Sequence, residues 1–219
     1  MWSNEVIKMI GIGILETLYM TFLPALVAYL IGLPIGILLV VTDKDGITPF
    51  VMLNKVVGVI VNILRSVPFI ILLITVMPFT RAIIGTTIGA TAVVIPLIIA
   101  SAPYIARLVE SSLKEVDKGV IEAAQSMGAT PLQIILKVLI PEAKPSLIIG
   151  GAIAVTTILS YSAMSGFVGG GGLGDIAIRY GYYRYETEIM LVTVVILVLI
   201  VQVIQEAGAL WMRRTDRRI

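Results

Sequence analysis

The stretch VIEAAQSMGATPLQIILKVLIP, residues 120–141, is a charged segment of helical character that lies between long apolar runs. Gly128 suits a left-handed cap and predicts the end of a first short helix. Thr130 is a good N-cap, Pro131 fits the first helical position, and Gln133 completes a capping box, so a second helix is predicted to begin there. The segment therefore predicts two short helices joined by a tight turn.

The second of these helices is predicted to carry a single apolar stripe. Leu132, Ile135, Leu136 and Leu139 are spaced at i, i+3, i+4 and i+7, which places them on one face. Pro141 is expected to stop the helix. On periodicity alone, such a stripe equally fits an amphipathic helix that rests among lipid headgroups.

The composition of the whole chain predicts a membrane protein. Of its 219 residues, 58% are hydrophobic and 14% are charged, below the roughly 25% charged residues of soluble domains. The net charge of +2 and the scattered basic residues argue against nucleic acid as a partner. The chain has no cysteine and no histidine, so thiol chemistry is excluded and the usual general base and metal ligand are missing. We expect no catalytic residue and no metal site.

Uncharged runs of about 20 residues are the expected membrane spans. They predict a single transmembrane domain over residues 1–219, with a retained N-terminus and five helical spans. The expected spans are 17–41, 57–79, 83–108, 146–167 and 188–211, with the segment 115–141 between the third and the fourth.

The first two spans leave structural alternatives open. Gly32 and Gly36 have GxxxG spacing, which fits either close helix packing or an ordinary lipid-facing surface, and Pro34 between them predicts a kink. Arg65 interrupts the second apolar run. Either one helix over 56–79 buries this arginine, or an interfacial helix ends near it and the arginine extends to the headgroups.

The distribution of lysine and arginine predicts the orientation in the membrane. The connections at 42–56 and 110–144 and the C-terminal tail together hold ten of these residues, against four on the opposite side. Basic residues are enriched in cytoplasmic loops. The C-terminus and the segment 115–141 are therefore predicted to be cytoplasmic, and the N-terminus to lie outside.

Gly169, Gly171 and Gly174 have the GxGxxG spacing of nucleotide-binding loops. That motif requires a preceding strand and a following helix within a βαβ unit, and a P-loop requires a Lys-Ser/Thr pair. Neither context is present between two spans, so the chain is predicted to have no ATP site of its own. The glycines are expected to form a flexible turn on the outer side, where a soluble partner could bind.

Residues 122–141 resemble the EAA loop of permease subunits of ATP-binding-cassette importers, with the pattern EAA-x3-G-x9-I-x-L-P. Glu122, Ala123, Ala124, Gly128 and Pro141 match, while Val138 and Ile140 replace the isoleucine and leucine of the pattern. The resemblance implies an all-α membrane protein of the type I importer fold, with a cytoplasmic helix-turn-helix coupling segment. It also implies a coupling surface that sits in a cleft of a cytoplasmic ATPase subunit. The residues expected at that surface are Glu122, Ala123, Ala124, Gly128, Ala129 and Pro141.

Residues 161–182, 100–116 and 126–134 further resemble the methionine-type permeases of this superfamily. That resemblance implies uptake of D- or L-methionine by a homodimeric permease in the bacterial inner membrane. It also implies an ATPase subunit dimer that binds ATP and Mg, and an extracytoplasmic substrate-binding lipoprotein; no cofactor is expected on this chain. Tyr161, Ser162, Met164 and Ser165 could line a pathway for a small zwitterion, although plain helix packing explains each of them equally well.

Other function classes remain as alternatives: a permease of the same type for another amino acid, an ion-driven secondary transporter, and a membrane anchor. A secondary transporter normally places an ionisable group near the bilayer midplane. Glu16, Glu110, Asp175 and Glu206 all fall near the ends of predicted spans. The sequence therefore favours an importer driven by a separate ATPase.

Overall fold

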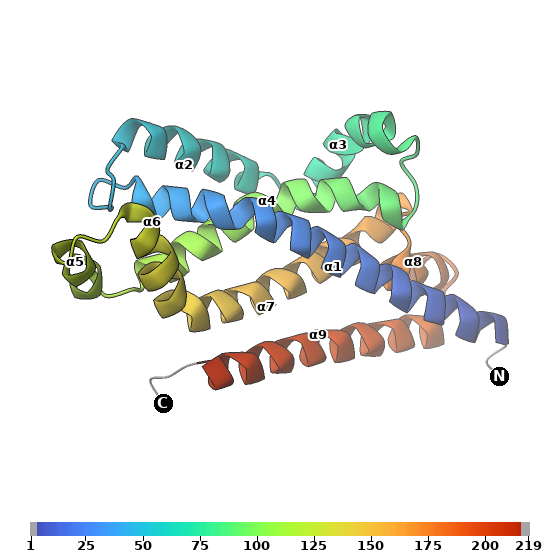
Figure 1. Ribbon diagram of the computed structural model, residues 1–219. Helices are drawn as coiled ribbons and strands as arrows, with labels where there is room; N and C mark the ends of the chain where they lie inside the picture. Colours follow the sequence, from blue (N-terminus) through green and yellow to red (C-terminus); the bar gives the residue numbers. More distant parts are fainter. Residues whose placement is uncertain (1–3, 216–219) are drawn as a thin grey trace. The chain divides into compact units, whose positions relative to one another are not determined.

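The structure is a computed structural model that describes residues 4–215, and every regular element in that range is helical (Figure 1). The α-helices are α1 (Asn4–Val41), α2 (Val51–Ser66), α3 (Phe69–Ile84), α4 (Ala90–Lys114), α5 (Lys118–Ser126), α6 (Pro131–Ile134), α7 (Ile140–Met164), α8 (Gly172–Ile176) and α9 (Thr187–Thr215). Two π-helical turns, η1 (Ile135–Leu139) and η3 (Ala177–Tyr182), and one 3-10 turn, η2 (Ser165–Val168), complete the set. The predicted all-α fold is confirmed. Arg217 and Arg218, which contributed to the predicted orientation, lie outside the described residues.

Four helical stretches within residues 4–215 are long and apolar enough to cross a membrane. They are α1, α4, the stretch Pro131–Val168, and α9. The helices α2 and α3 meet the same criteria only as a pair separated by a short break, and together they give a fifth candidate. Residues 4–215 thus hold four or five candidate spans, as expected of the predicted membrane fold.

The second predicted span, 57–79, is not one continuous helix. Helix α2 ends at Ser66, and α3 begins at Phe69 with Pro68 as its N-cap residue. Proline has no backbone N–H and disfavours helical geometry in the preceding residue, so the chain breaks here. Arg65 lies exposed in the last turn of α2. The alternative of a helix that ends near Arg65 is therefore correct, and the single helix that buries this residue is wrong.

The first predicted span also has a different boundary. Helix α1 begins at Asn4, well before the predicted start at residue 17. The uncharged-run criterion excluded residues 4–16 because they include Glu5, Lys8 and Glu16. Charged side chains do not break helical geometry, so the helix continues through them.

The described residues form two compact units. One of them comprises residues 28–66, 102–153 and 206–215. Here the second half of α1 packs closely on α4. A Cβ atom at Gly32 would lie 2.8 Å from Cγ2 of Ile105, and one at Gly36 would lie 2.6 Å from the carbonyl oxygen of Ala106. Only glycine permits this approach. The GxxxG pair is therefore a packing contact and not a lipid-facing surface.

The turn that leads from α1 to α2 is fastened to both helices. The backbone N–H of Thr48 donates to the carbonyl of Val41 at 3.0 Å. The side-chain amide of Asn54, in α2, donates to the carbonyl oxygen of Leu39 at 2.6 Å and to Oγ1 of Thr42 at 3.1 Å. These bonds give the turn at residues 42–48 a fixed conformation beside the end of α1.

The other unit comprises residues 4–27, 67–101 and 154–205, and the glycine-rich segment lies inside it. All five residues of α8 are buried. The N–H of Gly172 donates to Oε2 of Glu16 at 2.7 Å, and the N–H of Leu173 donates to Oγ1 of Thr17 at 2.9 Å. The expectation of a flexible turn is therefore wrong, because these glycines allow close backbone packing against α1.

Candidate functional site

Helix α5 is capped at both ends. Asp117 is the N-cap, and its carboxylate accepts from the N–H of Gly119 at 2.7 Å. At the other end, the N–H of Gly128 donates to the carbonyl of Gln125 at 2.9 Å, and the N–H of Ala129 donates to that of Ala124 at 3.1 Å. This pair of bonds is a Schellman motif.

Gly128 supplies the geometry that this turn requires. Its φ angle is +78°, in the left-handed region that glycine adopts without steric cost. The chain can therefore reverse direction within three residues, between the last residue of α5 and the N-cap of α6. The predicted left-handed cap at Gly128 is confirmed.

Helix α6 begins with a complete capping box. Oγ1 of Thr130 accepts from the N–H of Gln133 at 3.4 Å, and Oε1 of Gln133 accepts from the N–H of Thr130 at 2.9 Å. Pro131 occupies the first turn, where its missing N–H costs nothing. The predicted start of the second helix is confirmed in each of these features.

Replacing Thr130 with alanine is expected to loosen the start of α6. The cap contributes about 1 kcal/mol, because the N–H groups of the first turn have few other partners. We expect faster hydrogen–deuterium exchange at residues 130–134 in the variant. The matched control is Thr48→Ala, which removes an exposed hydroxyl from another turn of the same unit. Equal exchange rates at 130–134 in the two variants would contradict a stabilising role for the cap.

Pro141 does not end the second helix, contrary to the prediction. The chain continues from α6 through the π-helical turn η1 into α7, and Pro141 is the second residue of α7. In η1, the N–H of Ile140 bonds to the carbonyl of Ile135, five residues back. In a regular α-helix, the proline ring would clash with the backbone carbonyl four residues earlier. The wider π-helical turn moves the backbone away from the ring and so accommodates Pro141.

The predicted apolar stripe is wrong for the same reason. Leu139 and Ile134 are buried, whereas Leu132 is 64% exposed and Leu136 is 56% exposed. A π-helical turn changes the angle between successive side chains, so the spacing of a regular α-helix no longer identifies the buried face. Ile134, which the stripe omitted, lies in the core of this unit.

The residues predicted at the coupling surface point in different directions. Glu122, Ala123, Gly128 and Pro141 are exposed, Ala129 is half-buried, and Ala124 is only 5% exposed. Ala124 packs inward, so its small size lets α5 lie close to its own chain. Glu122 and Ala123 are instead exposed, and Glu122 also borders the cavity between α5 and the turn at residues 42–48.

Exposed apolar side chains accompany these polar positions. Met127 in the turn is 82% exposed and Val120 on α5 is 43% exposed, in addition to Leu132 and Leu136. Large apolar side chains next to charged ones are typical of surfaces that bind another protein. Met127 was not among the predicted surface residues, although its place directly before Gly128 put it in the predicted turn.

A cavity of about 380 Å³ separates α5 from the turn at residues 42–48. Its lining includes Glu122 and Gln125 of α5, Lys114 at the end of α4, and Asp43 and Asp45 of the turn. The α5–α6 pair therefore has an outward surface and a partly open inner side, which leaves room for α5 to move.

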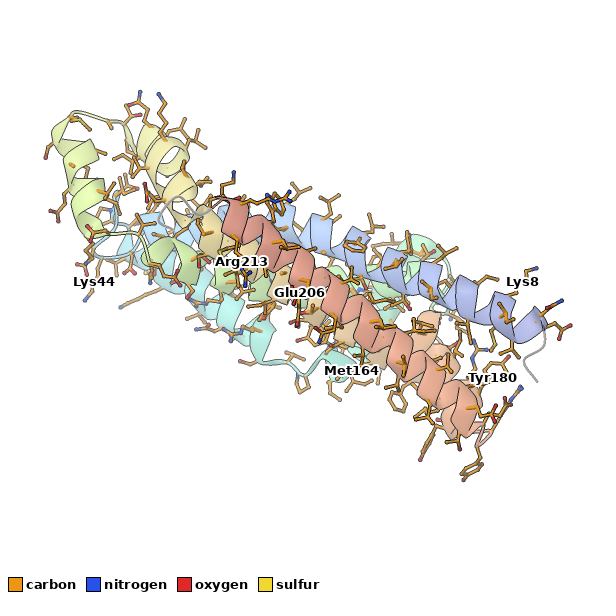
Figure 2. The ribbon with its side chains drawn as sticks, turned by 90° about the horizontal axis from the view of Figure 1, so that it is seen from below. Lys8, Lys44, Met164, Tyr180, Glu206 and Arg213 are labelled. Carbon is orange, nitrogen blue, oxygen red and sulfur yellow. The ribbon has the colours of Figure 1, made fainter. Side chains whose placement is uncertain are left out.

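The four residues predicted along a pathway do not share one exposed surface. The Tyr161 ring stacks on Phe69 with the ring centroids 4.5 Å apart. Ser162 and Ser165 are fully buried, and each donates to a backbone carbonyl three residues earlier. Met164 is 46% exposed (Figure 2). The sequence suggested one shared pathway for the four residues. In the structure, Tyr161 packs on Phe69, and the two serines bond to the backbone of their own helical segment.

Comparison with known proteins identifies what the chain resembles. Residues 32–219 match the family described as binding-protein-dependent transport system inner membrane component. The chain is 52% identical over 203 residues to the probable D-methionine transport system permease protein MetI of Vibrio cholerae, covering 93% of this chain and 90% of that protein. It is 51% identical over 154 residues to the D-methionine transport system permease protein MetI of Escherichia coli K12, covering 70% of this chain and 71% of that protein.

Solved structures give a consistent result. The chain superposes with a TM-score of 0.97 and 47% identity on a chain of the inward-facing MetNI methionine ABC transporter, covering 99% of this chain and all of that one. A chain of an amino acid ABC transporter with histidines superposes with a TM-score of 0.78 at 23% identity, covering 98% of this chain and all of that one, and this match concerns the fold alone.

Proposed function

The chain belongs to the family of binding-protein-dependent transport system inner membrane components, and on that premise we propose that it is the permease subunit of an ATP-driven methionine importer. The substrate is D-methionine, L-methionine or both. The observation that carries this proposal is the match over nearly the whole chain to a methionine ABC transporter subunit at 47% identity. The candidate spans of this chain supply the path through the membrane.

The energy for transport comes from a separate subunit in this proposal. Two ATPase subunits bind ATP and Mg, and each binds the α5–α6 pair of one permease through Glu122, Ala123, Gly128 and the neighbouring exposed side chains. Three features support the assignment: the match to the EAA pattern, the exposure of Glu122 and Ala123, and the exposed Met127 next to α5. The proposed surface also includes Ala124, Ala129 and Pro141, of which Ala124 packs inward.

The remaining partners follow from the same proposal. A second copy of the chain completes the translocation path, and an extracytoplasmic substrate-binding lipoprotein delivers methionine. Lipid covers exposed apolar side chains such as those along α9. The C-terminus and the α5–α6 pair lie in the cytoplasm and the N-terminus outside, as the excess of basic residues on one set of connections indicates.

The proposal predicts that methionine uptake depends on ATP and not on an ion gradient. In right-side-out vesicles that contain the assembled transporter, uptake should persist when ionophores collapse the proton and sodium gradients while ATP is maintained inside the vesicles. Depletion of ATP with the gradients kept should abolish it, because the energy of hydrolysis drives the conformational change. The measurement is the initial rate of labelled methionine accumulation in each condition. Uptake that follows the gradient would instead favour a secondary transporter.

A further inference from the structure

A chain of ion pairs runs along the last part of α4 and reaches the neighbouring elements at both ends. Nη1 of Arg107 lies 2.5 Å from Oε2 of Glu110, and Oε1 of Glu110 lies 2.9 Å from Nζ of Lys114. The same Nζ lies 2.9 Å from Oδ2 of Asp43 in the turn after α1. We call these four residues the α4 ion-pair chain.

The other end of the α4 ion-pair chain holds α2. Nη2 of Arg107 donates to the carbonyl oxygen of Gly58 at 3.0 Å and to Oδ1 of Asn62 at 2.8 Å. Gly58 and Asn62 are four residues apart, on one face of α2. Three elements are thus joined by charged hydrogen bonds: α2, α4 and the turn at residues 42–48.

Such an arrangement is a poor way to gain stability. The Glu110 side chain is 12% exposed and the Arg107 side chain is 23% exposed, and both lie on a helix that qualifies as a membrane span. Removing two charges from water costs about as much as their attraction returns, so a buried pair contributes little net stability. Its established benefit is to specify one arrangement of neighbouring elements, since any other leaves a charge unpaired.

The position of the α4 ion-pair chain connects it to α5. Lys114 is the last residue of α4, and Asp117, the N-cap of α5, follows three residues later. Asp43 and Lys114 also line the cavity beside α5, together with Glu122. The Lys114–Asp43 pair is thus close to α5 both along the chain and across this cavity.

Asp43 is suited to a contact that must persist at neutral pH. The hydrogen bond from Lys114 holds the pKa of the Asp43 carboxyl below its ordinary value, with a smaller contribution from the N–H of Lys44, while burial opposes them. The lowered pKa keeps the carboxylate charged, so the pair is present above the ordinary aspartate range and is lost only in acid.

We propose that the α4 ion-pair chain positions α2 and the turn at residues 42–48 relative to α4, so that a displacement of α5 reaches α2. This assignment rests on the proposed function, in which an ATPase moves α5. Asp43, Arg107, Glu110 and Lys114 act as positioning residues. They fix the geometry through which α5 acts, and they touch neither nucleotide nor substrate.

The test compares import with ATP hydrolysis in the assembled transporter reconstituted in liposomes. In Asp43→Asn and Glu110→Gln, the methionine imported per ATP hydrolysed should fall about tenfold, within the range of typical coupling free energies. Hydrolysis should continue because the surface that faces the ATPase is unchanged. Lys114→Arg keeps a donor for both carboxylates and should retain most of the wild-type ratio.

The matched control is Asp45→Asn, which removes the same charge from the same turn at a position outside the ion-pair chain. Its import per ATP should equal that of the wild type. A merely structural contact would lower the amount of transporter, or import and hydrolysis together, without changing their ratio. An unchanged ratio in Asp43→Asn, or an equal fall in Asp45→Asn, would therefore overturn the proposal. Absence of ATP-dependent uptake by the wild type would instead refute the proposed function.

Discussion

Replacing Gly128 with valine is expected to abolish methionine uptake while the protein still inserts in the membrane. The φ angle of +78° lies in the left-handed region, where an ordinary L-residue costs about 1–2 kcal/mol and a β-branched one more. The turn between α5 and α6 must then change its geometry, which moves Glu122 and Met127 away from the positions that a partner recognises. Uptake and the amount of protein in the membrane are measured in parallel.

Two comparisons make this prediction specific. Asparagine adopts the left-handed conformation more readily than other non-glycine residues, so Gly128→Asn should retain substantial uptake. Gly11→Val changes an exposed helical glycine whose surroundings are open, and it should leave uptake near the wild-type level. Normal uptake in Gly128→Val would show that the turn has no role in transport.

The same surface can be tested through its charge. Glu122 is exposed, and no ion pair of this side chain is observed among residues 4–215. Glu122→Lys should therefore fold and insert normally but lose uptake, because the reversed charge repels whatever cationic group the glutamate contacts on the ATPase. Transport at the normal rate in this variant would remove the coupling assignment for Glu122.

Replacing Gly36 with leucine is expected to destabilise the unit that contains α2 and the second half of α1. A Cβ atom at this position would lie 2.6 Å from both the carbonyl oxygen of Ala106 and Cβ of Val109. Neither atom can move unless α4 moves, so α1 and α4 must separate. Overpacking of this kind typically costs about 1–3 kcal/mol, and more where the obstacle is backbone.

The measurement is thermal unfolding of the protein in detergent, together with its yield from membranes. Gly11→Leu is the matched control, because nothing lies within 4 Å of a Cβ atom there. We expect a lower unfolding temperature and a lower yield for Gly36→Leu alone. Equal unfolding temperatures in the two variants would contradict the close α1–α4 contact.

Local signals were sufficient to predict the end of α5 and the start of α6. Capping residues act on backbone groups within the same turn, so Gly128, Thr130 and Gln133 could be interpreted from the sequence alone. Pro68 was a comparable local signal for the break between α2 and α3. The two alternatives for this region were instead based on Arg65, and the break was only one of them.

Other errors concern features that no nearby residue pattern indicated. The predicted helix end at Pro141 and the predicted apolar stripe were wrong because η1 is a π-helical turn. No local pattern around Ile135–Leu139 indicated such a turn. The glycine run was expected to be flexible because its contacts with Glu16 and Thr17, 156 residues away, cannot be inferred from the run itself. Likewise, the Asp43–Lys114 pair joins two regions that the span assignment treated as separate loops.

Co-purification tests directly whether a separate ATPase drives this chain through the α5–α6 pair. The tagged chain should be extracted from native membranes in mild detergent, and the ATP hydrolysis of the purified material should be measured. The account predicts a stoichiometric ATP-hydrolysing partner with the wild type and with Gly11→Val, and its loss with Gly128→Val. A chain that purifies without such a partner, while its membranes still accumulate methionine, would contradict it.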